Sequence, residues 1–252
     1  MSGRAKNQRF WDVDLARGVA IVMVALYHLI YDFDNLAGYG VESTSGFWGV
    51  FADVSAFMFV FLVGLSLTLS YARARVGAGG SLFGKYLRRG LRILAYGMLI
   101  TLVFWALDFG TVIFGILHLI GVSIVLAYPF LRFGLPNLFL GLAVIAVGAY
   151  MQSRDVSSGS AWLAPLGVVP ENLFMPDYRP LLPWFGVVLL GVFFGNAVYL
   201  AWRRERPPAT RMPASAAPLA FLGRHTLFIY LVHQPVFIAV LWALGMVGTG
   251  PA

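Results

Sequence analysis

The sequence contains no cysteine among its 252 residues. This absence excludes a disulfide framework, a thiolate nucleophile and a zinc site built from cysteines. Charge is also scarce, because Asp, Glu, Lys and Arg make up 12% of the chain, whereas hydrophobic residues make up 60% and the mean hydropathy is +0.80. A water-soluble domain of this length is much less apolar. The composition therefore predicts an integral membrane protein.

The apolar residues fall in blocks of about twenty, the length at which a helix crosses the hydrocarbon core of a bilayer. The blocks predict an all-α integral membrane protein, a bundle of about seven transmembrane helices in a single domain that occupies residues 1–252. The predicted helices lie near residues 17–35, 48–71, 91–108, 112–131, 135–152, 181–202 and 217–246.

The net charge of +7 comes from basic residues beside the hydrophobic blocks, so it gives no reason to expect nucleic acid as a partner. If the N-terminus is cytoplasmic, sixteen of the 18 Lys and Arg residues fall on the inner side, and only Arg154 and Arg179 fall outside. This distribution follows the positive-inside rule. It predicts a cytoplasmic N-terminus and a C-terminus on the outside.

The first predicted helix carries polar groups at helical spacing, among them Arg17, His28 and Asp32. Arg17 and His28 are eleven residues apart, about three turns, so they share one face at a separation of roughly 16 Å. Asp32 lies one turn beyond His28 and can accept a hydrogen bond from one imidazole nitrogen, which leaves the other to take a proton. This spacing suits a general base. The alternatives are a buried polar pair that joins helices and a pair at the outer interface.

Two further histidines lie inside predicted helices. His118 stands between Gly115 and Gly121, which permit close approach of helices, so a functional role and a packing role are equally open. His233 lies in the middle of the last predicted helix, where Pro235 removes a backbone donor and can kink the helix to open a cavity. We predict that both belong to the catalytic group with His28 and Asp32.

A basic cluster, Lys85, Arg88, Arg89 and Arg92, precedes and opens the third predicted helix on the side assigned to the cytoplasm. Such a cluster can grip a polyphosphate, but it can equally enforce topology or contact anionic lipid. Gln234 and Trp184 are predicted to contact substrate, although Trp184, at the outer end of its helix, also suits the role of an interface anchor.

Six stretches of the chain follow one another in a recognisable order. They are Asp14-Leu-Ala-Arg-Gly-Val-Ala with His28 and Asp32, Phe59-Val-Phe-Leu-Val-Gly, Lys85-Tyr-Leu-Arg-Arg, Phe114-Gly-Ile-Leu-His-Leu-Ile-Gly, Pro180-Leu-Leu-Pro-Trp-Phe-Gly and Leu222-Gly-Arg-His-Thr-Leu-Phe-Ile-Tyr-Leu-Val-His-Gln-Pro. In this order they resemble the catalytic-domain family of heparan-alpha-glucosaminide N-acetyltransferase, specifically its short prokaryotic branch within the transmembrane acyltransferase superfamily. The interval between Arg17 and His28 also resembles the arginine-to-histidine motif of bacterial membrane O-acetyltransferases.

The resemblance implies transfer of an acetyl group from cytoplasmic acetyl-CoA to an amino or hydroxyl group of an extracytoplasmic sugar or glycolipid, in a prokaryotic plasma membrane. Arg17 and the basic cluster would hold the CoA phosphates, His28 would act as general base, and His118, His233 and Gln234 would line the cavity. The animal enzyme has its catalytic histidine after the outer end of the corresponding helix, where this chain has none. No metal is expected, membrane lipid is a partner, and a homodimer is left open.

Two other functions fit the same polar residues. A seven-helix metal hydrolase would gather His28, Asp32, His118 and His233 around zinc. A proton-coupled transporter or flippase would use these groups as a proton relay, and the lack of recognisable inverted repeats in the sequence argues against it only weakly.

Overall fold

A computed structural model describes residues 10–76, 79–106, 112–154, 161–170, 175, 177–205 and 212–247. Within these ranges the regular structure is helical, apart from one isolated bridge between Gly115 and Tyr178. The chain divides into two compact units: Met1–Leu62 together with Ala209–Ala252 form the first, and Val63–Pro208 form the second. The single domain expected from the sequence stays a prediction.

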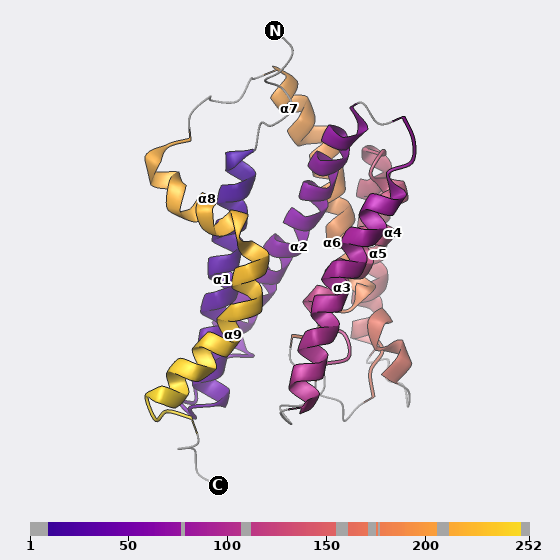
Figure 1. Cartoon of the computed structure of the whole chain (residues 1–252). Coiled ribbons are helices and arrows are strands. Elements are labelled where there is room, and N and C mark those ends of the chain that lie inside the picture. The colour runs from indigo at the N-terminus through magenta and orange to yellow at the C-terminus, as the bar shows by residue number, and fades with distance from the viewer. Residues whose placement is uncertain are drawn as a thin grey trace. The chain divides into compact units, whose positions relative to one another are not determined.

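The first unit joins the two ends of the chain (Figure 1). Its elements are α1 (Trp11–Asn35), the first part of α2 (Gly46–Arg75), the short η5 (Ala214–Ala216), α8 (Ala217–Arg224) and α9 (Thr226–Ala243). α8 and α9 both pack on α1. The contact with α8 is backbone against backbone, because a Cβ atom on Gly18 would overlap the Leu219 carbonyl and one on Gly223 would overlap the Asp14 carbonyl. Glycine at these positions therefore sets how closely α1 and α8 approach.

The second unit continues α2 and adds two closely packed helix pairs, α3 with α4 and α5 with α6. Its elements after α2 are α3 (Phe83–Ala106), α4 (Ile116–Leu126), η2 (Tyr128–Phe130), α5 (Leu135–Ser153), η3 (Ala161–Leu166), α6 (Leu181–Phe193), the π-helical η4 (Phe194–Tyr199) and α7 (Leu200–Glu205). α4 is the most buried of these, with Ile116–Gly121 wholly inside the unit. It forms the centre of the second unit.

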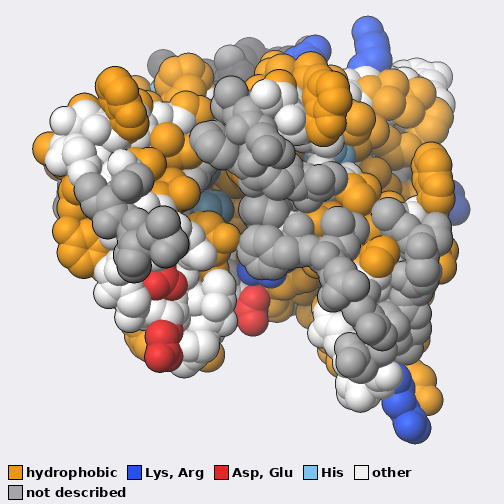
Figure 2. Space-filling view, turned by 90° about the horizontal axis from the view of Figure 1, so that it is seen from below, with side chains coloured by type: hydrophobic (Ala, Val, Ile, Leu, Met, Phe, Trp, Pro, Cys, Tyr) orange, Lys and Arg blue, Asp and Glu red, His pale blue; other side chains and the backbone are white. Residues whose placement is uncertain are grey.

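Six helical runs in the described part of the chain are long and apolar enough to cross a membrane. They are α1, α2, α3, α5, the continuous run Leu181–Trp202 and α9. Large apolar side chains are exposed on them, such as Phe47, Trp105 and Trp242, and Figure 2 shows hydrophobic side chains over much of the visible surface. Exposed apolar surface on this scale belongs in lipid. The prediction of an all-α integral membrane protein is confirmed.

Two of the seven predicted spans are not one continuous helix of membrane-crossing length. The stretch 112–131 contains only the 11 residues of α4, because Gly115 is extended before it and Pro129 lies in the 3-10 turn that follows. At about 1.5 Å per residue, α4 is too short to cross a bilayer. The stretch 217–246 breaks at His225, whose backbone (φ −108°, ψ 16°) separates α8 from α9.

The third helix starts earlier than predicted, at Phe83, and so includes all four residues of the basic cluster. The last two residues of the predicted span 91–108 lie outside the described residues, as do the basic residues Arg4, Lys6, Arg9, Arg206 and Arg211.

Candidate active site

Two histidines of the first unit lie against each other where α9 packs on α1. His28 Nδ1 is 3.0 Å from His233 Nε2, and the two ring centroids are 4.8 Å apart. His233 is buried and His28 is half-buried. Because 205 positions separate them in the sequence, only the packing of α9 on α1 brings them together.

Backbone carbonyls determine where the protons of this pair lie. His233 Nδ1 is 2.7 Å from the Tyr230 carbonyl oxygen, which can only accept, so Nδ1 donates and the neutral ring keeps its lone pair on Nε2. That lone pair accepts from His28 Nδ1–H, which also lies 3.1 Å from the Val24 carbonyl oxygen. This tautomer assignment follows from the hydrogen-bond network. It makes Nε2 the proton-accepting nitrogen of His28, as a general base requires.

One turn beyond His28, a carboxylate meets an amide. Asp32 is 1% exposed, and its Oδ1 accepts a hydrogen bond of 2.6 Å from Gln234 Nε2. The other acceptor of each side chain, Asp32 Oδ2 and Gln234 Oε1, is buried and has no hydrogen-bond partner among the described residues. Buried polar atoms are nearly always paired, so these two acceptors mark a place where donors from another molecule can bind.

This pairing differs from the hydrogen bond expected between His28 and Asp32. The imidazole of His28 is directed at α9 and contacts His233. Asp32 accepts its hydrogen bond from Gln234, the residue that follows His233 on α9. His233 and Gln234, which are adjacent on α9, thus contact His28 and Asp32 of α1, respectively. The expected neighbours are brought together, but each has a different partner.

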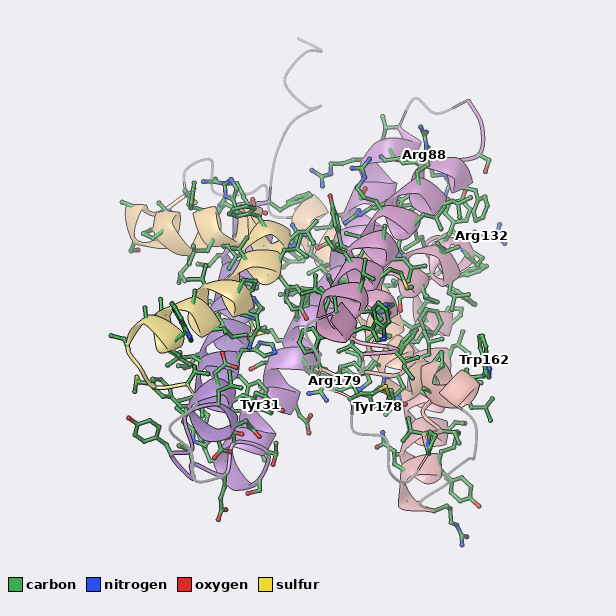
Figure 3. All side chains as sticks on the ribbon, turned by 60° about the horizontal axis from the view of Figure 1, so that its bottom comes forward. Tyr31, Arg88, Arg132, Trp162, Tyr178 and Arg179 are labelled. Carbon is green, nitrogen blue, oxygen red and sulfur yellow. The ribbon has the colours of Figure 1, made fainter. Side chains whose placement is uncertain are left out.

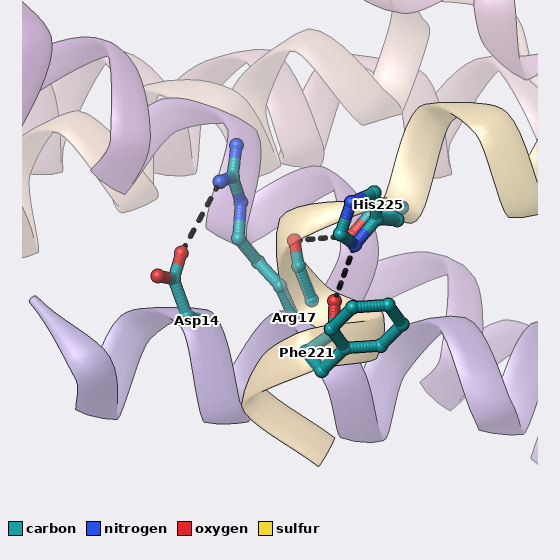
Figure 4. Close-up of polar contacts among 6 residues, drawn as sticks. Asp14, Arg17, Phe221 and His225 are labelled. Atoms are coloured by element: carbon teal, nitrogen blue, oxygen red, sulfur yellow. Dashed lines mark hydrogen bonds and ion pairs between the residues drawn. The ribbon is translucent and has the colours of Figure 1, made fainter. Parts of the chain in front are cut away.

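Arg17 lies nearer the start of α1, on the stretch that packs against α8 (Figure 4). Its Nη1 is 3.8 Å from Asp14 Oδ1, and the Arg17 side chain is 34% exposed. At the end of α8, His225 donates from Nδ1 to the Phe221 carbonyl oxygen at 2.9 Å. A part-exposed guanidinium can donate charge-assisted hydrogen bonds to a phosphate.

His118 occupies the first turn of α4 in the second unit and is 3% exposed. Its Nδ1 accepts from the Gly115 backbone N–H at 3.2 Å, so a neutral ring carries its proton on Nε2, which lies 3.4 Å from Thr101 Oγ1. Gly97 on α3 leaves room for the ring, since a Cβ atom there would come within 3.0 Å of Nδ1. Nδ1 therefore caps the start of α4 while Nε2 faces Thr101 of α3, and the geometry favours a structural role.

Residues of the segment before α6 complete that cap. The Ile116 backbone N–H donates to Asp177 Oδ2 at 3.3 Å, and Tyr178 pairs with Gly115 in the isolated bridge. The Tyr178 hydroxyl donates to the Ala164 carbonyl oxygen at 2.7 Å. Burial raises the pKa of Tyr178 to about 12. These contacts tie the segment before α6 to the start of α4.

The basic cluster and Trp184 also belong to the second unit. Lys85, Arg88 and Arg92 are exposed along one face at the start of α3, and Arg89 is half-buried. In Figure 3, Arg88 and Arg132 lie toward one end of this unit, and Tyr178 and Arg179 lie toward the other. The Arg179 guanidinium is 5.1 Å from the centroid of the Trp184 ring, a cation–π distance.

A family model described as heparan-alpha-glucosaminide N-acetyltransferase, catalytic, matches residues 9–235. The match includes every predicted site residue and nearly the whole chain. The chain belongs to this family. No curated protein and no solved structure shows significant similarity to it. Membership in the heparan-alpha-glucosaminide N-acetyltransferase catalytic family, together with the apolar helices, makes the chain a membrane protein of an acetyltransferase family.

In this acetyltransferase-family chain, the structure brings four predicted residues together in the first unit: His28, Asp32, His233 and Gln234. His118 and the basic cluster are in the second unit. Among the described residues, no three His, Asp or Glu side chains gather closely enough to hold a metal ion.

One residue of the site was not anticipated from the sequence. The Phe237 ring meets the His233 ring edge to face, with centroids 5.8 Å apart and an interplanar angle of 88°. Residues four apart on a helix are neighbours, so the spacing was a usable signal. That signal is weak in this chain, because phenylalanine is common throughout it, with 21 copies.

Proposed function

We propose that this protein transfers an acetyl group from cytoplasmic acetyl-CoA to an amino or hydroxyl group of an extracytoplasmic sugar or glycolipid, with His28 as general base. The observation that carries the proposal is the part-buried contact between His28 and His233. It supports a proton on His28 Nδ1 and a lone pair on Nε2, the tautomer that can deprotonate an acceptor. Family membership supports acetyl transfer as the reaction.

The reaction needs one proton to move away from the acceptor and one to reach the leaving group. As the acceptor oxygen or nitrogen attacks the thioester carbonyl, His28 Nε2 takes its proton, and the positive charge that develops on the imidazole is shared through Nδ1–H with His233. The new bond joins the acetyl carbon to the acceptor, and the carbon–sulfur bond breaks. The imidazolium then returns its proton to the CoA thiolate. A transient acyl-histidine is the alternative route.

The basic side chains have the chemistry to bind the donor. CoA carries several phosphates, and exposed lysine and arginine groups bind phosphate well. Lys85, Arg88 and Arg92 line one exposed face of α3, and Arg17 is part-exposed on α1. The rise from Arg17 to His28 along α1, roughly 16 Å, suits an extended pantetheine arm.

We also propose the orientation that the charge distribution favours, with the N-terminus in the cytoplasm and the C-terminus outside. Arg88 and Arg132 lie toward the same end of the second unit, which is consistent with both facing the cytoplasm (Figure 3). In this orientation Asp32 is nearer the outer surface than Arg17. The acceptor would then enter from outside and the donor from inside.

The test uses purified protein, radiolabelled acetyl-CoA and soluble amino-sugar acceptors. The His28→Ala variant should lose acetyl transfer by a factor of about 10²–10⁴, the contribution typical of a positioned base. His225→Gln is the matched control, because His225 belongs to the same unit but caps α8. It should keep the wild-type rate. Wild-type transfer by His28→Ala, or proton-coupled uptake without thioester cleavage, would contradict the proposal.

A further inference from the structure

An apolar groove runs along α1 beside the candidate active site. It has a volume of about 330 Å³, and its lining side chains are apolar, among them Val22, Ala25, Leu26 and Leu29 of α1, Leu222 of α8 and Phe237 of α9. Ile21 and Leu29 mark its extent on α1, a rise of about 12 Å. The volume lies at the lower end of the range for small-molecule sites.

One side chain belongs both to this groove and to the histidine pair. Phe237 lines the groove, and the same ring packs edge to face on His233, which accepts the hydrogen bond from His28. Leu29, also in the lining, follows His28 directly in the sequence. A molecule in the groove therefore lies beside the group that positions the base.

The order of features along α1 matches the build of an amphipathic acceptor. The apolar lining extends from Ile21 to Leu29, His28 lies at its end, and Asp32 follows one turn later with its partner Gln234. Asp32 Oδ2 and Gln234 Oε1 are the buried acceptors that lack donors. The hydroxyl or amino groups of a sugar can donate hydrogen bonds to both atoms. A tail, a reacting group and a polar head would be accommodated in that order.

We infer that the acetyl acceptor is lipid-linked, and that its hydrocarbon chain lies in the groove while its sugar head reaches His28 and the Asp32–Gln234 pair. The inference rests on the proposed function and narrows its acceptor to a lipid-linked sugar. In the proposed orientation the head lies toward the outer surface and the chain points to the bilayer centre, as in a lipid of the outer leaflet.

The groove suits a single chain better than a helix of a second copy. A helix with its side chains is about 10 Å across, and a stable interface buries at least about 1,000 Å², whereas the groove has a volume of only about 330 Å³. A chain gains little by leaving lipid for an equally apolar groove, so the benefit is positional: an anchored head is held near His28 at a high effective concentration.

The test compares ethyl, hexyl and dodecyl glycosides of glucosamine as acceptors for protein in lipid nanodiscs. We expect kcat/KM to rise at least about tenfold from the ethyl to the dodecyl glycoside. Ala25→Phe fills the groove and should abolish the rise, so that kcat/KM no longer depends on the length of the hydrocarbon chain. Ala239→Phe, at an exposed position of α9 outside the lining, is the matched control and should behave as wild type.

Binding is measured separately, without acetyl-CoA, with a dodecyl glucosaminide that carries a photoreactive diazirine in its chain. The inference expects labelling of the peptides around Leu26 and Phe237, competed by unmodified dodecyl glucosaminide but not by phosphatidylcholine, and reduced in Ala25→Phe. Labelling competed equally by phosphatidylcholine would show that ordinary membrane lipid fills the groove, and would overturn the inference, as would equal responses of Ala25→Phe and Ala239→Phe. Specific labelling without acetyl transfer would refute the proposed function while supporting the binding site.

Discussion

Replacing His233 by leucine tests whether this residue positions the base. In the wild type, His233 Nε2 accepts the hydrogen bond from His28 Nδ1–H at 3.0 Å. Leucine fills a similar volume but accepts no hydrogen bond, so His28 Nδ1–H keeps the Val24 carbonyl as an acceptor but the imidazolium loses its contact with the His233 ring. Losing a hydrogen bond to a charged group, here the imidazolium of His28, costs about 1.5–3 kcal/mol. A central value of about 2 kcal/mol corresponds to a fall in kcat of roughly thirtyfold.

The assay can follow the release of CoA thiol with a chromogenic reagent, because the protein itself contains no cysteine to react. The KM for acetyl-CoA should change little, since His233 is not among the basic groups proposed to bind phosphate. His233→Gln should recover most of the activity, because the amide oxygen can accept from His28 Nδ1–H. A purely structural role for His233 would not produce this rescue.

A double variant tests whether His233 acts through His28. In a His28→Ala background, His233→Leu should have almost no further effect, because a positioning residue acts only through the residue it positions. If the two losses multiply, or if His233→Leu alone retains the wild-type kcat, His233 does not act through His28 and the tautomer argument is wrong.

Three further predictions concern stability and the cap of α4. Gly18→Ala should lower the free energy of unfolding by about 3 kcal/mol in a thermal or denaturant assay, because the added Cβ meets the Leu219 carbonyl. Gly84→Ala, with open space around it, should be neutral or slightly stabilising. Equal effects of the two variants would contradict the close packing of α1 on α8. His118→Leu should cost about 1–2 kcal/mol of stability. His118→Asn, which keeps an acceptor for the Gly115 N–H, should retain both stability and activity. A loss of activity in a stable His118→Asn variant would indicate a catalytic role for His118. The folded-state pKa of Tyr178 is raised from 10.0 to about 12, so its contribution to stability is complete below pH 10 and is lost as the pH rises through about 12. Spectrophotometric titration and alkaline unfolding should show this loss of stability in the wild type but not in Tyr178→Phe.

The sequence by itself determined the membrane class, most of the long helices and the family. Blocks of about twenty apolar residues have one solution in a bilayer, because a helix satisfies its own backbone hydrogen bonds there. Polar residues inside such blocks are costly, so His28, Asp32 and His233 stood out without any structure. The short α4 was harder to predict, because apolar residues around Gly115 and Pro129 hide the breaks at its two ends.

Only the tertiary structure decided which polar residues are partners. Helical periodicity assigns His28 and Asp32 to one face of α1, but it does not say which other helix that face meets. The partners proved to be His233 and Gln234, 205 and 202 positions away. That choice depends on how α8 and α9 pack on α1, and the packing depends in turn on Gly18, where α8 reaches the backbone of α1 because no side chain intervenes.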